Sequence, residues 1–171
     1  MIRKYVRLII ASLILIGAVL LFFKGFIFIG ILVVLVSVFV TLSHFRNENI
    51  ILAFYFIKKN NIPSAMNAVS RIKHPEYLIK SQEAYYYLLN GMLESQQHNI
   101  SKAEKSFKKA LSVGLRMDSD QAVAKLNLAG IYLAQRNKKL AQHYLQDAKK
   151  LDKQKMLKAQ IREVEEMMKR V

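Results

Sequence analysis

The sequence predicts an all-α protein with two parts. A two-helix transmembrane hairpin over residues 1–46 precedes an α-solenoid of about three helix pairs with a C-terminal capping helix, over residues 47–171. Three observations lead to this prediction: two long apolar runs in the first 45 residues, a 38-residue period in the remainder, and an apolar stripe in the last segment. With 171 residues in the chain, these parts leave little room for a second globular domain.

The two apolar runs extend from Tyr5 to Phe23 and from Phe26 to Phe45. Each is about 20 residues long, and a helix of that length rises far enough to cross the roughly 30 Å hydrocarbon layer of a bilayer. A cleaved signal peptide followed by one anchor is the alternative. It fits less well because a signal peptide has an apolar stretch of only about 7–15 residues and a small-residue cleavage site.

Lys24 and Gly25 separate the two runs, and this short connection predicts a tight turn between antiparallel helices, in which glycine can adopt positive φ. Basic residues lie at or near the outer ends of both runs and favour the cytoplasmic side: Arg3, Lys4, Arg7, Arg46, Lys58 and Lys59. The sequence therefore predicts an integral membrane protein that contacts the lipid bilayer through residues 5–45 and has cytoplasmic N- and C-termini.

Five kinds of position recur every 38 residues in the second part. They are a small residue (Ala53, Gly91 and Ala129), an asparagine (Asn61, Asn99 and Asn137), an alanine (Ala65, Ala103 and Ala141), a larger apolar residue (Val69, Phe107 and Leu145) and a further apolar residue (Ile72, Ala110 and Ala148). Small residues on two facing helices let the backbones approach closely, and the larger residue fills the space toward the next unit. The period therefore predicts stacked pairs of antiparallel helices.

The connections between these helices contain residues that favour chain reversals, helix ends and helix starts. The asparagines fall where each chain segment must reverse, at a position where left-handed backbone is tolerated. Longer connections are expected at Lys73–Lys80 and Ser112–Asp120. In the second of these, Gly114 is a helix stop, and Asp118, Ser119 and Asp120 offer an N-cap for the next helix.

The repeated units resemble tetratricopeptide repeats, over about residues 48–152. The matching residues are Leu52, Ala53, Phe56 and Ala65 in the first unit, Tyr87, Gly91, Ala103, Phe107 and Ala110 in the second, and Leu128, Ala129, Tyr132, Ala141, Leu145 and Ala148 in the third. Three features depart from the family. The 38-residue period exceeds the usual value of about 34, the closing proline is absent, and Val69 and Ile72 replace an aromatic residue and an alanine.

The resemblance implies that the first helix of each unit lines a concave face. The candidate binding residues on that face are Phe54, Ile57, Tyr85, Leu88, Met92, Leu126 and Leu133. Ile50, Phe54, Leu89 and Val123 stand where some family members carry the Lys and Asn residues that hold a peptide's terminal carboxylate. A receptor for chaperone tails is therefore not supported.

The last segment carries an apolar stripe at spacings of three and four residues, formed by Leu157, Ile161, Val164, Met168 and Val171. Such a stripe on a helix otherwise rich in charge predicts a capping helix that covers the open end of the array. A coiled-coil seam or a partner-helix seam is the alternative.

The sequence offers no constellation for catalysis. It contains no cysteine, and its four histidines, His44, His74, His98 and His143, are too widely spaced for a helical metal site. Neither a phosphate-binding glycine loop nor a nucleophile elbow is present. We therefore expect no catalytic residues, no metal and no cofactor, and a protein that is not an enzyme.

Two functions remain for such a chain. The first is a membrane-anchored scaffold or adaptor, for example an accessory subunit of a membrane complex, whose array binds a peptide or helix of a protein partner. The alternative is a basic module that binds anionic lipid or nucleic acid, because residues 46–171 carry 23 basic against 12 acidic residues. The lysines alternate with acidic and polar residues at helical spacing, as on an ordinary helix exterior, so nucleic acid ranks below protein as the partner.

Overall fold

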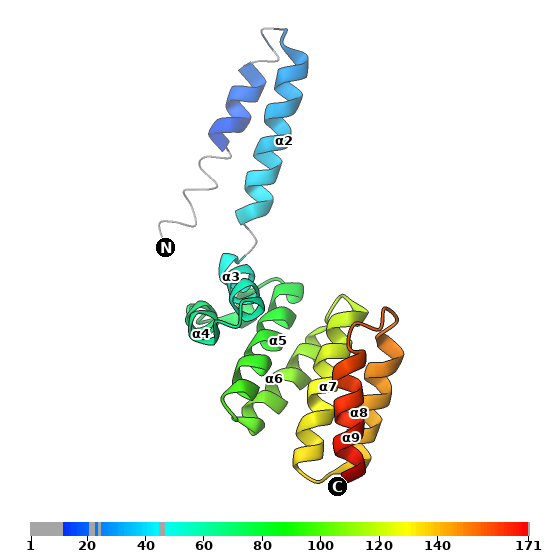
Figure 1. The fold of residues 1–171 in the computed structure, drawn as a ribbon. Coiled ribbons are helices and arrows are strands. Elements are labelled where there is room, and N and C mark those ends of the chain that lie inside the picture. Colours follow the sequence, from blue (N-terminus) through cyan, green and yellow to red (C-terminus); the bar gives the residue numbers. More distant parts are fainter. Residues whose placement is uncertain (1–11, 21–22, 24, 45–46, 171) are drawn as a thin grey trace. The chain divides into compact units, whose positions relative to one another are not determined.

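A computed structural model describes residues 12–20, 23, 25–44 and 47–170 of the chain. The chain divides into two units, residues 1–47 and residues 48–171. The described residues form helices and turns, with no strand among them (Figure 1). The all-helical part of the prediction is therefore confirmed.

The first unit is helical over residues 12–20 and in α2, Ile27–His44. Between these helical segments Gly25 has a φ of 80°, the left-handed conformation expected of a glycine in this turn, while Lys24 lies outside the described residues. Small side chains are buried in both segments, at Ala18 and Ser37. The two segments therefore contain positions at which helices can pack closely.

The transmembrane hairpin expected over residues 1–46 is wrong. Among the residues that the structure describes, no helix is long and apolar enough to cross a membrane. α2 has 18 residues, and at about 1.5 Å per residue it extends about 27 Å, less than the roughly 30 Å hydrocarbon layer. Of the other expected span, residues 12–20 and Phe23 are described as helix, and residues 5–11, 21 and 22 lie outside the described part.

The localisation that followed from this hairpin must be corrected too. The integral membrane protein with cytoplasmic N- and C-termini, in contact with the bilayer through residues 5–45, required two complete spans. The apolar composition of the two runs suggested sufficient length. Within the described residues, however, no continuous apolar helix is long enough to cross a membrane.

The second unit consists of antiparallel helix pairs followed by a final single helix (Figure 1). Its elements are α3 (Glu48–Lys58), α4 (Ile62–Ser70), the 3₁₀ segment η1 (Pro75–Tyr77), α5 (Lys80–Gln96), α6 (Ile100–Val113), α7 (Asp118–Ala134), α8 (Lys138–Leu151) and α9 (Lys158–Arg170). Within the pairs, α3 packs on α4, α5 on α6 and α7 on α8, and successive pairs meet through α4 and α5, α6 and α7, and α8 and α9. This is solenoid-like packing, as the 38-residue period predicted.

The three reversals inside the pairs have the same backbone conformation. Each contains one residue in the left-handed region, at Asn60, His98 and Arg136, with φ of 56°, 60° and 57°. The asparagine that follows donates its backbone N–H to a carbonyl five residues earlier, as in Asn137 N to Tyr132 O at 2.8 Å. The sequence placed the reversal correctly, but the left-handed residue precedes the repeated asparagine.

The repeated asparagine instead begins the second helix of each pair as its N-cap. The Asn61 side chain accepts a hydrogen bond from Ser64 N, and the Asn137 side chain accepts one from Leu140 N, both at 3.2 Å. Asn99 occupies the same position, but its amide donates to Glu94 at 2.8 Å and does not cap the helix. Two of the three asparagines therefore satisfy an otherwise free N–H of the first helical turn.

The small residues of the period lie where the helices of a pair meet. Ala53, Ala65, Ala103, Ala129 and Ala141 are completely buried. At Gly91 a Cβ atom would stand 2.8 Å from the ring of Phe107, closer than real Cβ contacts allow. The glycine therefore leaves room for a phenylalanine that is itself completely buried.

The core of the second unit has two clusters, and α5 contributes to both. Leu89 and Leu93 pack with α3 and α4, whereas Ala84 and Leu88 pack with α6, α7 and the following helices. Each helix pair therefore covers an apolar face of its neighbour, as in a repeat array.

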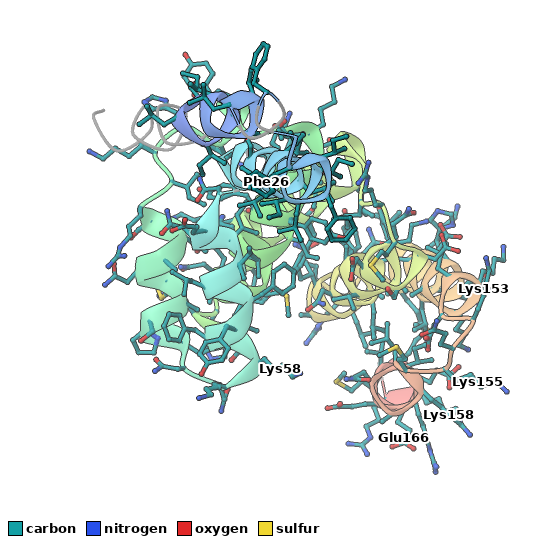
Figure 2. The ribbon with its side chains drawn as sticks, turned by 90° about the horizontal axis from the view of Figure 1, so that it is seen from above. Phe26, Lys58, Lys153, Lys155, Lys158 and Glu166 are labelled. Atoms are coloured by element: carbon teal, nitrogen blue, oxygen red, sulfur yellow. The ribbon has the colours of Figure 1, made fainter. Side chains whose placement is uncertain are left out.

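α9 covers the end of the array. Ile161 and Val164 of the predicted stripe are buried in the core and Leu157 and Met168 are partly buried, while Val171 lies outside the described residues. Seen nearly end-on in Figure 2, α9 carries Lys158 and Glu166 on its exposed side. A charged outer face on a terminal helix keeps a solenoid from adding further units.

The connection before α7 differs in part from expectation. Gly114 ends α6 with a φ of 105°, as a glycine stop should. The N-cap of α7 is Met117, whose side chain makes no capping hydrogen bond, whereas Asp118 and Asp120 lie in the first turn of the helix. At that position the two carboxylates favour the positive end of the helix dipole.

Two glycine substitutions test the close approach inside the pairs. Gly91→Ala places a methyl group against the Phe107 ring and should destabilise the chain by about 1–3 kcal/mol. Gly130→Ala is the matched control on α7, because among the described residues no heavy atom outside the adjoining helix backbone lies within 4 Å of the added Cβ. It should leave stability unchanged or raise it by up to about 1 kcal/mol through helix propensity. Urea unfolding of both variants measures the difference, and equal midpoints would contradict the packing described.

A second pair of substitutions tests the caps. Asn137→Ala removes the acceptor for Leu140 N and should cost about 1 kcal/mol, within the roughly 0.5–2 kcal/mol typical of lost N-caps. Asn99→Ala at the equivalent position removes no cap and should cost clearly less. Thermal unfolding followed by circular dichroism compares the two, and a larger loss for Asn99→Ala would count against this assignment.

Candidate docking surface

The structure places the seven predicted binding residues in two environments. Leu88, Leu126 and Leu133 are buried, with exposed fractions of 2, 7 and 5%. Phe54 is 39% exposed, and Ile57, Tyr85 and Met92 are half-buried. The difference arises because the first helix of each pair faces a helix on either side, so only part of its circumference remains open.

Phe54 and Tyr85 belong to a chain of contacts across three first helices. Their rings meet edge to face with centroids 5.7 Å apart, which joins α3 to α5. The Tyr85 hydroxyl donates to Asp120 Oδ2 at 2.6 Å, which joins α5 to α7. Burial, and then this hydrogen bond to a carboxylate, raise the pKa of Tyr85 to about 12. Tyr85 therefore stays neutral in ordinary buffers and connects neighbouring pairs.

A groove lies beside Leu126 and Leu133, between α7 and α9. One part of it has a volume of about 330 Å³, and its walls include Leu126, Ile131 and Val164. Ser95 of α5 and Ile100 of α6 also line this part. The adjoining part, of about 310 Å³, is lined by Gly130, Leu133, Ala134, Met167 and Arg170. Both parts share Gly130, Ala134 and Met167, so they form one continuous depression. We call it the α7–α9 groove.

Gly130 keeps this groove open. Among the described residues, no heavy atom outside its own stretch of helix lies within 4 Å of the place where its Cβ would stand, so the helix backbone itself forms part of the floor. Met167 is 40% exposed and supplies a flexible apolar wall. Asn127, Gln160 and Glu163 add polar groups to the first part of the groove, and Arg170 adds a cation to the second.

The α9 side of the groove was missed from the sequence. The predicted stripe assigned Val164 and Met168 to the array, whereas Met167 lies outside that stripe and lines the groove. Its signal was the pair of consecutive methionines, which a helix directs about 100° apart, so that one can pack inward while the other stays accessible. Ala134, the last residue of α7, was missed as well.

The most strongly perturbed carboxylate lies elsewhere, between α6 and α7. Glu104 accepts hydrogen bonds from Lys108 Nζ at 2.7 Å, from the Tyr132 hydroxyl at 2.9 Å and from Gln135 Nε2 at 3.1 Å. These bonds, that from Lys108 first, lower the pKa of Glu104 to about 2. Because both carboxylate oxygens are occupied by neighbours from two helices, the cluster connects successive pairs and offers no free base.

The histidines of the second unit do not converge on a site. His74 precedes η1 and its Nδ1 lies 2.9 Å from Glu76 Oε1, His98 occupies a reversal, and the His143 ring packs against Tyr144. Among the described residues, no group of three side chains from His, Cys, Asp and Glu could hold a metal ion.

Comparison of the chain with protein-family models, with curated proteins and with solved structures finds no match in any of the three. The basis for a functional assignment is therefore the chemistry of the chain's own grooves.

Acid unfolding tests the Glu104 cluster. The folded pKa of about 2 lies below the ordinary value of 4.5, so ionisation of Glu104 favours the folded state. Its contribution to stability is complete above about pH 4.5 and is lost as the pH falls toward about 2. Glu104→Gln should therefore be less stable than the parent chain at pH 7, and the difference should shrink over that range.

Urea unfolding at a series of pH values measures this difference. Glu163→Gln, at an exposed position on α9, is the control and should follow the parent chain more closely. A stability difference for Glu104→Gln that stays constant from pH 7 to pH 2.5 would show that the carboxylate's ionisation does not couple these helices.

Proposed function

We propose that residues 48–171 form a tetratricopeptide-type docking module that binds a segment of a partner protein in the α7–α9 groove. The observation that carries the proposal is this groove itself, because it is open, mainly apolar, and lined by the first helices α5 and α7, the start of α6 and the terminal helix. The module acts as a scaffold or adaptor and is not an enzyme.

The tetratricopeptide assignment is supported by features that recur at the same spacing. Small residues occupy the contacts within pairs, the three reversals share one left-handed position, and a terminal helix covers the last pair. These features belong to a repeat array whose first helices are available for binding on one face. Leu126 and Leu133, two of the predicted binding residues, lie on the first helix α7 and border the groove.

The chemistry of the groove defines its occupant. The part around Leu133 and Met167 has an apolar lining with Arg170 at its edge, and the part around Leu126 adds the amides of Asn127 and Gln160. An apolar side chain fits the part around Leu133 and Met167, and the amides can bond to a peptide backbone. The occupant we propose is therefore a short protein segment that presents apolar side chains and contains a carboxylate within reach of Arg170.

Peptides selected from a phage-displayed random library on the full chain provide the test. Gly130→Leu fills the floor of the groove, and selected peptides should bind this variant at least about tenfold more weakly, a loss of about 1.4 kcal/mol. Ala159→Leu is the matched control, since it adds the same side chain to an exposed position of α9 outside the groove. It should bind as the parent chain does.

Salt distinguishes this function from binding through the basic surface. Burial of apolar area is not screened, so affinity should change little between about 50 and 200 mM salt, whereas a ligand held by many lysine–phosphate contacts loses orders of magnitude. Selected peptides that bind Gly130→Leu as tightly as the parent chain would overturn the proposal. Loss of binding at moderate salt with no effect of Gly130→Leu would assign the function to the basic surface.

A further inference from the structure

A second groove, of about 420 Å³, lies between α8 and α9. Its apolar floor includes Leu145, which is buried, and Met168, which is partly buried. Three lysines line it: Lys138 and Lys149 come from α8, and Lys169 comes from the last turn of α9. We call it the α8–α9 groove.

The surroundings of this groove carry an excess of positive charge. Residues 138–170 contain ten basic and five acidic side chains. The acid that lines the groove, Glu165, already has a partner, because it accepts from Lys149. Among the residues that the structure describes, no carboxylate pairs with Lys138 or Lys169. Lys138 and Lys169 therefore lie beside an apolar floor and can bind anionic groups of a ligand.

Two glutamines add amide groups to the lining of the groove. Gln142 and Gln146 lie one helical turn apart on α8, both exposed and both lining the groove. Each amide can donate to a carbonyl and accept from an N–H group, the two functions that a peptide backbone requires. Lysines, amides and an apolar floor thus lie together in one depression.

We infer that the α8–α9 groove binds an acidic segment of a protein, with carboxylates at Lys138 and Lys169 and an apolar side chain over Leu145 and Met168. The charges are complementary, and the amides match a peptide backbone. Nucleic acid fits less well because the described residues that line the groove include no aromatic side chain to stack on a base. A phosphate-bearing lipid headgroup could bind the lysines, but it has no peptide backbone to which the amides of Gln142 and Gln146 could bond.

The residues that line this site are not shared with the α7–α9 groove. Val164 and Met167 face the α7–α9 groove, whereas Glu165, Met168 and Lys169 face the α8–α9 groove. Substitutions at Lys138 and Lys169 therefore leave the apolar groove intact, and Gly130→Leu leaves the lysines intact.

The test uses the full chain and a fluorescein-labelled peptide of alternating glutamate and leucine, with binding followed by fluorescence anisotropy. The double substitution Lys138→Ala with Lys169→Ala should weaken binding roughly five- to tenfold, as expected for the loss of two partly solvated charge contacts. Lys102→Ala with Lys105→Ala is the matched control, because it removes the same charge from exposed positions of α6. It should change affinity less than twofold.

Three further arms decide the class of ligand. A peptide of alternating lysine and leucine should not bind, and an oligothymidylate and phosphatidylserine vesicles should compete with the glutamate–leucine peptide only weakly. Equal weakening by both double substitutions would show that net charge, and not this groove, holds the peptide. If the oligothymidylate or the vesicles bind more tightly than the peptide and lose affinity in the Lys138 and Lys169 variant, the groove takes phosphate and the inference is wrong.

Discussion

The close approach of the two helices in each pair is the constraint on which the rest of the second unit depends. It is tightest at Gly91, where the Phe107 ring occupies the space that a Cβ would need. Gly91 and Phe107 belong to the same pair, α5 and α6, so the missing side chain makes room for a large ring between the two helices. Phe107 and Leu145 are both buried in a cluster that extends over several helices. A pair therefore depends on its neighbour for burial of its apolar face, which makes the array cooperative along its length.

Much of this fold could be predicted because each requirement recurs with the period. Three copies of a small residue and of an asparagine identify the pair contact and the reversal, even though each copy alone is a weak signal. The left-handed residue was harder to place. It is Asn60 in one reversal but His98 and Arg136 in the others. A histidine or an arginine in a sequence does not predict positive φ as a glycine does. The backbone geometry of the reversal imposes that conformation, while the repeated asparagine is conspicuous for its capping role.

The first unit shows the limit of composition. A run of apolar residues shows that a segment is compatible with lipid, but a transmembrane span also requires a sufficiently long helix. Among the described residues, no helix is both apolar enough and long enough. The binding face shows a related limit. Repeat position identified Leu126 and Leu133 at the groove, yet it also selected Leu88, which packs inside the core. Met167 went unnoticed because its role depends on how α9 packs, and the repeat period ends before α9.

α9 is one wall of both grooves, and it presents different residues to each of them. Val164 and Met167 give an apolar wall toward α7, whereas Met168 and Lys169 combine an apolar floor with positive charge toward α8. Burial of Ile161 and Val164 holds the helix in place, and a wall fixed before binding reduces the entropy lost when a ligand binds. A ligand that shifted α9 in one groove would necessarily reshape the other. Any resulting change in affinity must be equal in both directions, because the coupling free energy belongs to the pair of sites.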